Sequence, residues 1–266
     1  MSALIWWHVV TGFVAGAAWI AACSTLASRG NAMLAGLIAG MPSTAVVSLL
    51  FMAMTLSPDA AVLGATAAPA ALGLNCVFLG VCGRLARAGW GVAMAAGLLA
   101  WALLAAAWWM FAPRDLASSL TTLAAGFAVG MIMTRNLSGD DTTAPRRTDG
   151  RITLMRALLG GAVVGVTVLV SYWGGDFAGG LAAAFPAVAA ATLAIVGWFS
   201  GPKKASAMLR HIMLANALTL APYLLVVRAT YGTIGVAAGT LLALAVSVFC
   251  AWGLYTVSRR CQRRAE

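Results

Sequence analysis

The residues of this chain best placed to do chemistry are four prolines inside apolar segments. Pro42 and Pro186 lie near the middle of two such segments, and Pro69 and Pro222 lie inside two others. A proline removes one helical hydrogen bond and clashes with the carbonyl four residues earlier. Within lipid, the freed carbonyl needs a protein partner or a water-lined cavity. The prolines therefore predict either simple kinks or broken helices, and the positive N-terminal end of a broken helix can bind an anion.

Polar side chains accompany these prolines. Asn75 comes six residues after Pro69, while Asn216 and Arg228 come six residues before and after Pro222. As alternatives, the asparagines join neighbouring helices by hydrogen bonds, and Arg228 reaches the outer interface, paired with Asp176 or Asp59. The predicted substrate-binding residues are Pro42, Ser43, Thr44, Asn75, Pro186, Asn216, Pro222, Tyr223 and Arg228.

Acidic side chains are missing from the middle of every apolar segment. The seven Asp and Glu residues lie in a polar linker, at the C-terminus or at the outer ends of segments. A proton-coupled cation exporter usually keeps a carboxylate or histidine at midspan. The sequence therefore favours an anionic substrate, with sodium held by backbone carbonyls as an open alternative. Because no catalytic, nucleotide-binding or metal-ligand motif occurs, we expect no enzyme activity, no cofactor and no metal.

The elements that must position these residues are membrane-spanning helices. The chain has 266 residues, of which 62% are hydrophobic and 9% charged, whereas soluble domains carry about 25% charged residues. This composition excludes a soluble enzyme, a DNA-binding domain and a disordered chain. A spanning helix needs about 20 mostly apolar residues. Nine segments qualify, at 4–27, 32–56, 60–83, 90–111, 116–133, 155–173, 177–199, 208–230 and 233–257.

The basic residues predict the orientation of these nine spans. Of the 17 lysines and arginines, only Arg114 and Arg228 fall on the side of the N-terminus, which leaves 15 on the opposite side. Basic loops stay in the cytoplasm. We therefore expect a multi-pass protein of the bacterial inner membrane with a periplasmic N-terminus and a cytoplasmic C-terminus. Its partners would be membrane lipids and no nucleic acid, and the oligomeric state stays open.

The two halves of the chain resemble each other. Three sequence pairs carry this repeat, namely Gly36–Pro42 with Gly180–Pro186, Ala68–Pro69 with Ala221–Pro222, and Ala95–Gly97 with Ala237–Gly239. Spans one to four thus match spans six to nine, and the single span between them inverts the second copy. The predicted parts are repeat 1 (1–112), a connecting span (113–135), a cytoplasmic linker (136–153) and repeat 2 with a basic tail (154–266). Inverted repeats are typical of secondary transporters.

The second half also resembles a known family. Arg156 to Gly160, Gly180-Leu181, Phe185-Pro186 and Pro222-Tyr223 are similar, in order and spacing, to the GlpM-type family of small bacterial inner-membrane proteins. The resemblance covers about residues 156–255 and implies a fused, inverted pair of family members. The family is associated with glycerol metabolism and exopolysaccharide output. We therefore expect a transporter, or a translocator of a lipid-linked substrate, with an anionic substrate. The alternative is a non-transporting membrane subunit of an envelope or exopolysaccharide biosynthesis complex.

Tryptophan and glycine residues predict how the helices sit in the membrane. Tryptophans near span ends predict an interfacial belt, with members Trp6, Trp7, Trp90, Trp108, Trp109, Trp173 and Trp198. Glycines four residues apart predict close helix packing, at Gly12/Gly16, Gly36/Gly40, Gly126/Gly130, Gly161/Gly165 and Gly235/Gly239.

Overall fold

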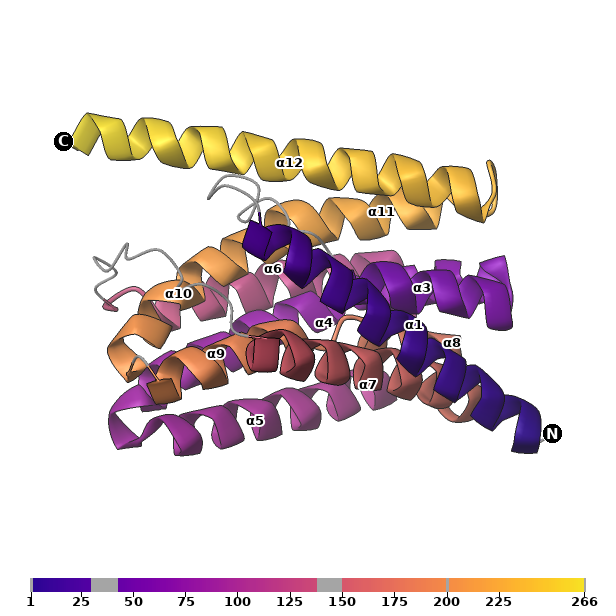
Figure 1. Ribbon diagram of the computed structural model, residues 1–266, viewed down its shortest axis with the longest axis horizontal. Coiled ribbons are helices and arrows are strands. Elements are labelled where there is room, and N and C mark those ends of the chain that lie inside the picture. Colours follow the sequence, from indigo (N-terminus) through magenta and orange to yellow (C-terminus); the bar gives the residue numbers. More distant parts are fainter. Residues whose placement is uncertain (1, 30–42, 138–149, 200, 266) are drawn as a thin grey trace.

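The computed structural model describes residues 2–29, 43–137, 150–199 and 201–265, and every regular element in these ranges is helical. The helices run broadly along the long axis of the molecule, and the two termini lie at opposite ends (Figure 1). The elements are α1 (Ser2–Arg29), α3 (Ser43–Thr55), α4 (Pro58–Leu85), the 3₁₀ turn η1 (Ala86–Ala88), α5 (Trp90–Phe111), α6 (Leu116–Met133), α7 (Gly150–Gly174), α8 (Asp176–Ala183), α9 (Ala187–Phe199), α10 (Pro202–Ala215), the π-helical turn η2 (Asn216–Leu220), α11 (Ala221–Thr230) and α12 (Val236–Ala265).

Most of the expected spans are observed as long apolar helices. Eight segments of the described chain are long and apolar enough to cross a membrane. The remaining expected span, at 32–56, is represented by α3, and its first half lies outside the described residues. Termini at opposite ends agree with an odd number of crossings (Figure 1). The chain is thus an all-α, multi-pass membrane protein.

Several helix boundaries differ from the approximate predicted ones. The span expected at 208–230 begins six residues earlier, where Pro202 occupies the first turn of α10 after Gly201 at φ 92°. Proline is well suited to a first turn because its missing N–H has no helical partner there. The linker expected at 136–153 ends at 149, since α7 begins at Gly150. The basic C-terminal tail continues α12 as helix through Ala265.

Helix α4 forms the centre of the molecule. It is buried along most of its length and contacts α3, α5, α6, α8, α10 and α11. Glycines allow this close approach, because a Cβ at Gly130 of α6 would lie 2.5 Å from the carbonyl oxygen of Cys76 in α4. Likewise, a Cβ at Gly161 of α7 would lie 2.6 Å from the carbonyl oxygen of Phe13 in α1. The Gly126/Gly130 and Gly161/Gly165 pairs therefore lie in tight helix contacts, as predicted.

Three of the four pairs of spans that the predicted repeat matches contact each other. Helix α1 packs against α7, α3 against α8, and α4 against both α10 and α11. Contacts between matched spans are expected when two similar halves pack around a common symmetry axis. The connecting helix α6 packs mainly against α4 and also contacts α10 of the second half. The inverted relation of residues 11–112 and 155–257 stays a prediction, to be checked by superposition.

Candidate functional site

The span expected at 177–199 is interrupted near its middle. Helix α8 ends at Ala183, and α9 begins at Ala187. Pro186 has no N–H and disfavours a helical conformation at the preceding residue, so the chain cannot continue as one helix. The N–H of Ala190 donates to the carbonyl of Pro186 at 2.7 Å and starts the new helix. The break that Pro186 predicts is therefore present, and it is buried.

Asn75 of the neighbouring helix α4 forms hydrogen bonds at this break. Its Nδ2 donates to the carbonyl oxygen of Ala184 at 2.9 Å, and its Oδ1 accepts a hydrogen bond from Nε1 of Trp101 at 2.7 Å. The Trp101 ring lies edge-on to Phe185, with ring centres 4.9 Å apart. The carbonyl freed at the break thus has a protein partner. This geometry matches the expectation that Asn75 joins neighbouring helices.

Three tryptophans on one face of α5 fasten the interrupted span along its length. Nε1 of Trp90 donates to the carbonyl oxygen of Leu193 in α9 at 2.9 Å. At the opposite end, Trp108 stacks on Phe177 of α8 with ring centres 5.4 Å apart. Trp101 lies between them at the break. We call Trp90, Trp101 and Trp108 the tryptophan clamp.

The clamp corrects the expected interfacial belt. Trp90 is only 5% exposed, and Trp108 is half-buried, with Nε1 donating to Oγ1 of Thr122 in α6 at 2.8 Å. The belt assignment was therefore wrong for these two residues, because a position near a span end does not specify which way the ring faces. The remaining predicted belt residues are exposed, namely Trp6, Trp7, Trp109, Trp173 and Trp198.

The expected break at Pro42 cannot be described in the same way. Pro42 lies outside the described residues, and Ser43 begins α3, with a side chain that also lies outside them. Thr44 is half-buried in the first turn of α3.

Pro69 and Pro222 occupy different local structures. Pro69 is buried inside α4, which continues as α-helix around it. Pro222 lies in the first turn of α11, directly after the π-helical turn η2. A π turn adds a residue to the helical repeat and often appears at functional sites. Asn216 begins this turn and is half-buried.

Arg228 lies on the exposed side of α11. Its Nε donates to Oγ1 of Thr66 in α4 at 3.1 Å. The expected carboxylate partners, Asp59 and Asp176, are thus replaced by a hydroxyl. This bond ties α11 to α4 and holds a cation at the edge of the central helix.

Tyr223 is fully buried, and its hydroxyl interacts with that of Tyr231, which lies 2.8 Å from Oγ1 of Thr240. Three other buried polar atoms have no hydrogen-bond partner within the described chain, namely Ser48 Oγ, Ser247 Oγ and Arg156 Nε. Buried polar groups normally have partners, so these three atoms are exceptions.

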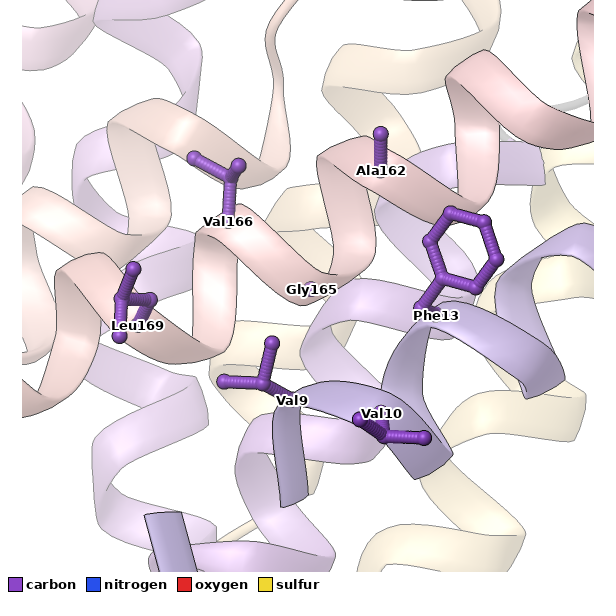
Figure 2. A pocket seen from close by; sticks show the side chains of 7 residues that line it. All are labelled: Val9, Val10, Phe13, Ala162, Gly165, Val166 and Leu169. Carbon is purple, nitrogen blue, oxygen red and sulfur yellow. The ribbon is translucent and has the colours of Figure 1, made fainter. Parts of the chain in front are cut away.

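A groove between α1 and α7 has a different chemistry. Figure 2 shows its lining, in which every drawn side-chain atom is carbon. The lining residues are Val9, Val10, Phe13, Ala162, Gly165, Val166 and Leu169. This surface offers nothing to an anion, but it suits a hydrocarbon chain.

The structure brings together only part of the predicted site. Asn75 meets the break at Pro186, whereas Arg228 meets Thr66. Among the described residues we find no group of three His, Cys, Asp or Glu side chains that could hold a metal. Sequence reasoning missed Trp101, Thr66 and Ser247, and it named Phe185 only as part of a sequence resemblance. The spacing of Trp90, Trp101 and Trp108, 11 and 7 residues apart, places them on one helical face and could have revealed the clamp.

No protein-family model, no curated protein and no solved structure matches this chain.

Proposed function

We propose that this membrane protein transports a small anion or translocates a lipid with an anionic head group. The observation that carries this proposal is the interrupted span α8–α9, which places two helix ends within a buried region. The N-terminal end of α9 carries a partial positive charge at the break. Interrupted helices of this kind bind substrates in secondary transporters. Because one partly buried helix end contributes up to about 2 kcal/mol, the substrate needs further donors nearby.

The distribution of charge supports an anion. The acidic residues of the described chain are Asp59, Asp115 and Asp176, each within the first turn or the cap of a helix. Among the described residues, therefore, no acidic side chain belongs to the break at 184–186 and could repel an anion there. The apolar groove between α1 and α7 supports the lipid form of the proposal, because it can hold an acyl chain while the head group occupies a polar site.

The rival proposal is a non-transporting membrane subunit of an envelope or exopolysaccharide biosynthesis complex. It draws support from the resemblance of residues 156–255 to the GlpM-type family. In that case, the buried break serves only to shape the bundle. Purified protein alone would then move no solute or lipid, and activity would depend on partner proteins.

The experiment is a flux assay with purified protein in liposomes. One arm measures uptake of radiolabelled phosphate and other small anions, and a second measures flipping of a fluorescent anionic phospholipid. Flux above that of protein-free liposomes in either arm supports transport. Absence of flux in both arms, with the protein correctly folded, favours the subunit.

We further propose a location in the bacterial inner membrane with the N-terminus outside. The 15-to-2 partition of basic residues supports this orientation. Reporter fusions at Thr143 and Glu266 should both give cytoplasmic signals. A periplasmic signal at either position contradicts the orientation and, with it, the inverted repeat.

A further inference from the structure

The groove between α1 and α7 is a hollow on the outside of the helix bundle. Its deepest lining residue is Gly165, which is buried, whereas Val10, Ala162 and Val166 of the lining are exposed (Figure 2). Both helices are long and apolar enough to cross a membrane, so their exposed side chains face hydrocarbon. The hollow has a volume of about 280 Å³. Pockets that enclose a whole ligand start at about 300 Å³, so this open hollow suits one part of a longer molecule.

Backbone packing fixes the walls of this hollow. A Cβ added at Gly160 of α7 would meet the Ile20 side chain of α1, and one added at Gly165 would lie 3.3 Å from the carbonyl oxygen of Val9. Residue numbers therefore rise along α7 while they fall along α1, so the two helices are antiparallel. Because glycine lets the helices approach this closely, the side chains on either side of the contact keep a fixed separation.

A polar pair lies just beyond one end of the hollow. Nδ1 of His8 lies 2.8 Å from the hydroxyl oxygen of Tyr172, and the two rings are stacked with centres 6.2 Å apart. His8 directly precedes Val9 of the lining. Tyr172 comes three residues after Leu169 and seven after Gly165, which places it on the same face of α7 about one turn further along. Both members of the pair are half-buried, so a molecule in the hollow can reach them.

The bond within this pair leaves one hydrogen-bond donor over. A neutral histidine ring carries one N–H group, and a tyrosine hydroxyl carries one O–H group. If the Tyr172 hydroxyl donates to Nδ1 of His8, the ring hydrogen lies on Nε2 and takes no part in the bond. If Nδ1 donates instead, the hydroxyl hydrogen takes no part in it. In either arrangement the pair can donate to a ligand, and the oxygens of a phosphate group are strong acceptors.

Exposed tryptophans place this end of the hollow at the membrane surface. Trp6 and Trp7 precede His8, and Trp173 follows Tyr172, and all three indole rings are exposed. Exposed tryptophans of membrane proteins gather at the level of the lipid head groups. The polar pair therefore lies at that level, and the apolar hollow begins below it, in the hydrocarbon. A phospholipid has the same order, with a phosphate group above its acyl chains.

We propose that the α1–α7 hollow and the His8–Tyr172 pair form one binding site for a phospholipid. One acyl chain lies along the hollow, and the phosphodiester of the head group accepts a hydrogen bond from the pair. The proposed orientation of the chain puts this lipid in the outer leaflet. This inference rests on the lipid form of the proposed function and gives that lipid a place.

Photocrosslinking tests this site directly. Purified protein is placed in liposomes that contain a trace of phosphatidylglycerol with a diazirine on one acyl chain, and the labelled residues are mapped by mass spectrometry after illumination. Ala162→Phe fills the hollow from an exposed position. The matched control is Ala102→Phe, which adds the same ring to an exposed alanine of α5. Gel filtration first shows that each variant is folded.

The expected result is labelling of residues 9–13 and 162–169 that exceeds labelling of the exposed face of α5 by at least about tenfold, the effect of one hydrogen bond to a charged group. Ala162→Phe should remove this excess, and Ala102→Phe should leave it unchanged. Even labelling of all lipid-facing helices would show only exchanging bulk lipid and overturns the site. An excess that survives Ala162→Phe overturns it as well, and absence of label from the hollow in a dimer would assign the hollow to a second copy of the chain.

A second probe tests the role of the polar pair. Diacylglycerol with the same diazirine-bearing chain lacks the phosphate group. The double variant His8→Phe/Tyr172→Phe keeps both rings and removes every donor of the pair. It should lower phosphatidylglycerol labelling about tenfold and leave diacylglycerol labelling unchanged. An equal change with both probes, or no change with either, overturns the assignment of the head group.

Lipid flipping measured on the same liposomes separates this inference from the proposed function. Flipping without preferential labelling of the hollow rejects this site alone. Preferential labelling without flipping rejects translocation alone and leaves a firmly bound lipid.

Discussion

Helices α5 and α12 are the fourth spans of the two predicted repeats, yet they face their neighbours with opposite kinds of surface. Helix α5 presents the tryptophan clamp, and each of its indole N–H groups bonds a different helix. Helix α12 presents small side chains, including Ser247 with an unpartnered hydroxyl. The difference teaches that bulky indole donors join α5 to three neighbouring helices, whereas small side chains let α12 pack closely against its neighbours.

The same contrast separates Asn75 from Arg228, which lie six residues after Pro69 and Pro222. Asn75 is buried and bonds two helices. Arg228 is exposed and makes one side-chain bond to Thr66. A buried amide with both ends bonded contributes to stability, whereas we expect an exposed guanidinium to contribute little to stability and to serve the proposed recognition of an anion. Four substitutions test this division, from the largest expected effect on stability to the smallest.

Asn75→Ala should lower the free energy of unfolding by about 3 kcal/mol, because it leaves the Ala184 carbonyl and the Trp101 indole buried without partners. Thermal unfolding of the purified protein in detergent measures the change. The exposed Asn136→Ala serves as the control and should have no effect. A loss below about 0.5 kcal/mol would show that Asn75 does not hold the break.

Trp101→Phe should cost less, about 1–2 kcal/mol, because phenylalanine keeps the contact with Phe185 and loses only the indole hydrogen bond. The same unfolding experiment applies. Trp109→Phe, an exposed change on the same helix, provides the comparison. Similar shifts in the two variants would contradict the clamp.

Tyr223→Phe should lower the free energy of unfolding by about 1 kcal/mol, because it removes the polar contact between the buried hydroxyls of Tyr223 and Tyr231. Thermal unfolding of the purified protein in detergent measures the change. A variant that is as stable as the unmodified protein, or more stable, would mean that the Tyr223 hydroxyl has no structural role.

Arg228→Gln should change stability by less than about 0.5 kcal/mol, since the side chain is exposed and glutamine can still bond Thr66. Comparison of its unfolding temperature with that of the unmodified protein measures this change. A large loss of stability would assign Arg228 to the framework instead.

Hydropathy predicted the membrane spans well because a lipid-facing helix must be apolar over its whole length. Pro186 also predicted the break in its span, since proline acts on its own backbone whatever surrounds it. The tryptophan clamp was missed because Trp90 and Trp108 lie near span ends, where exposed rings are equally common. Ser247 was missed because a single serine in an apolar helix carries no information about which neighbour it faces. The packing that decides such cases involves residues far apart in the sequence.

The most direct test of the account is anion flux into liposomes by three proteins: the unmodified chain, Arg228→Gln and Arg114→Gln. Arg114 lies on the same predicted side of the membrane but is exposed outside the helices, so it controls for loss of outer positive charge. The account predicts flux by the unmodified protein and by Arg114→Gln, with about a tenfold loss in Arg228→Gln at equal protein content. Flux absent in all three proteins, or equal in all three, would contradict it.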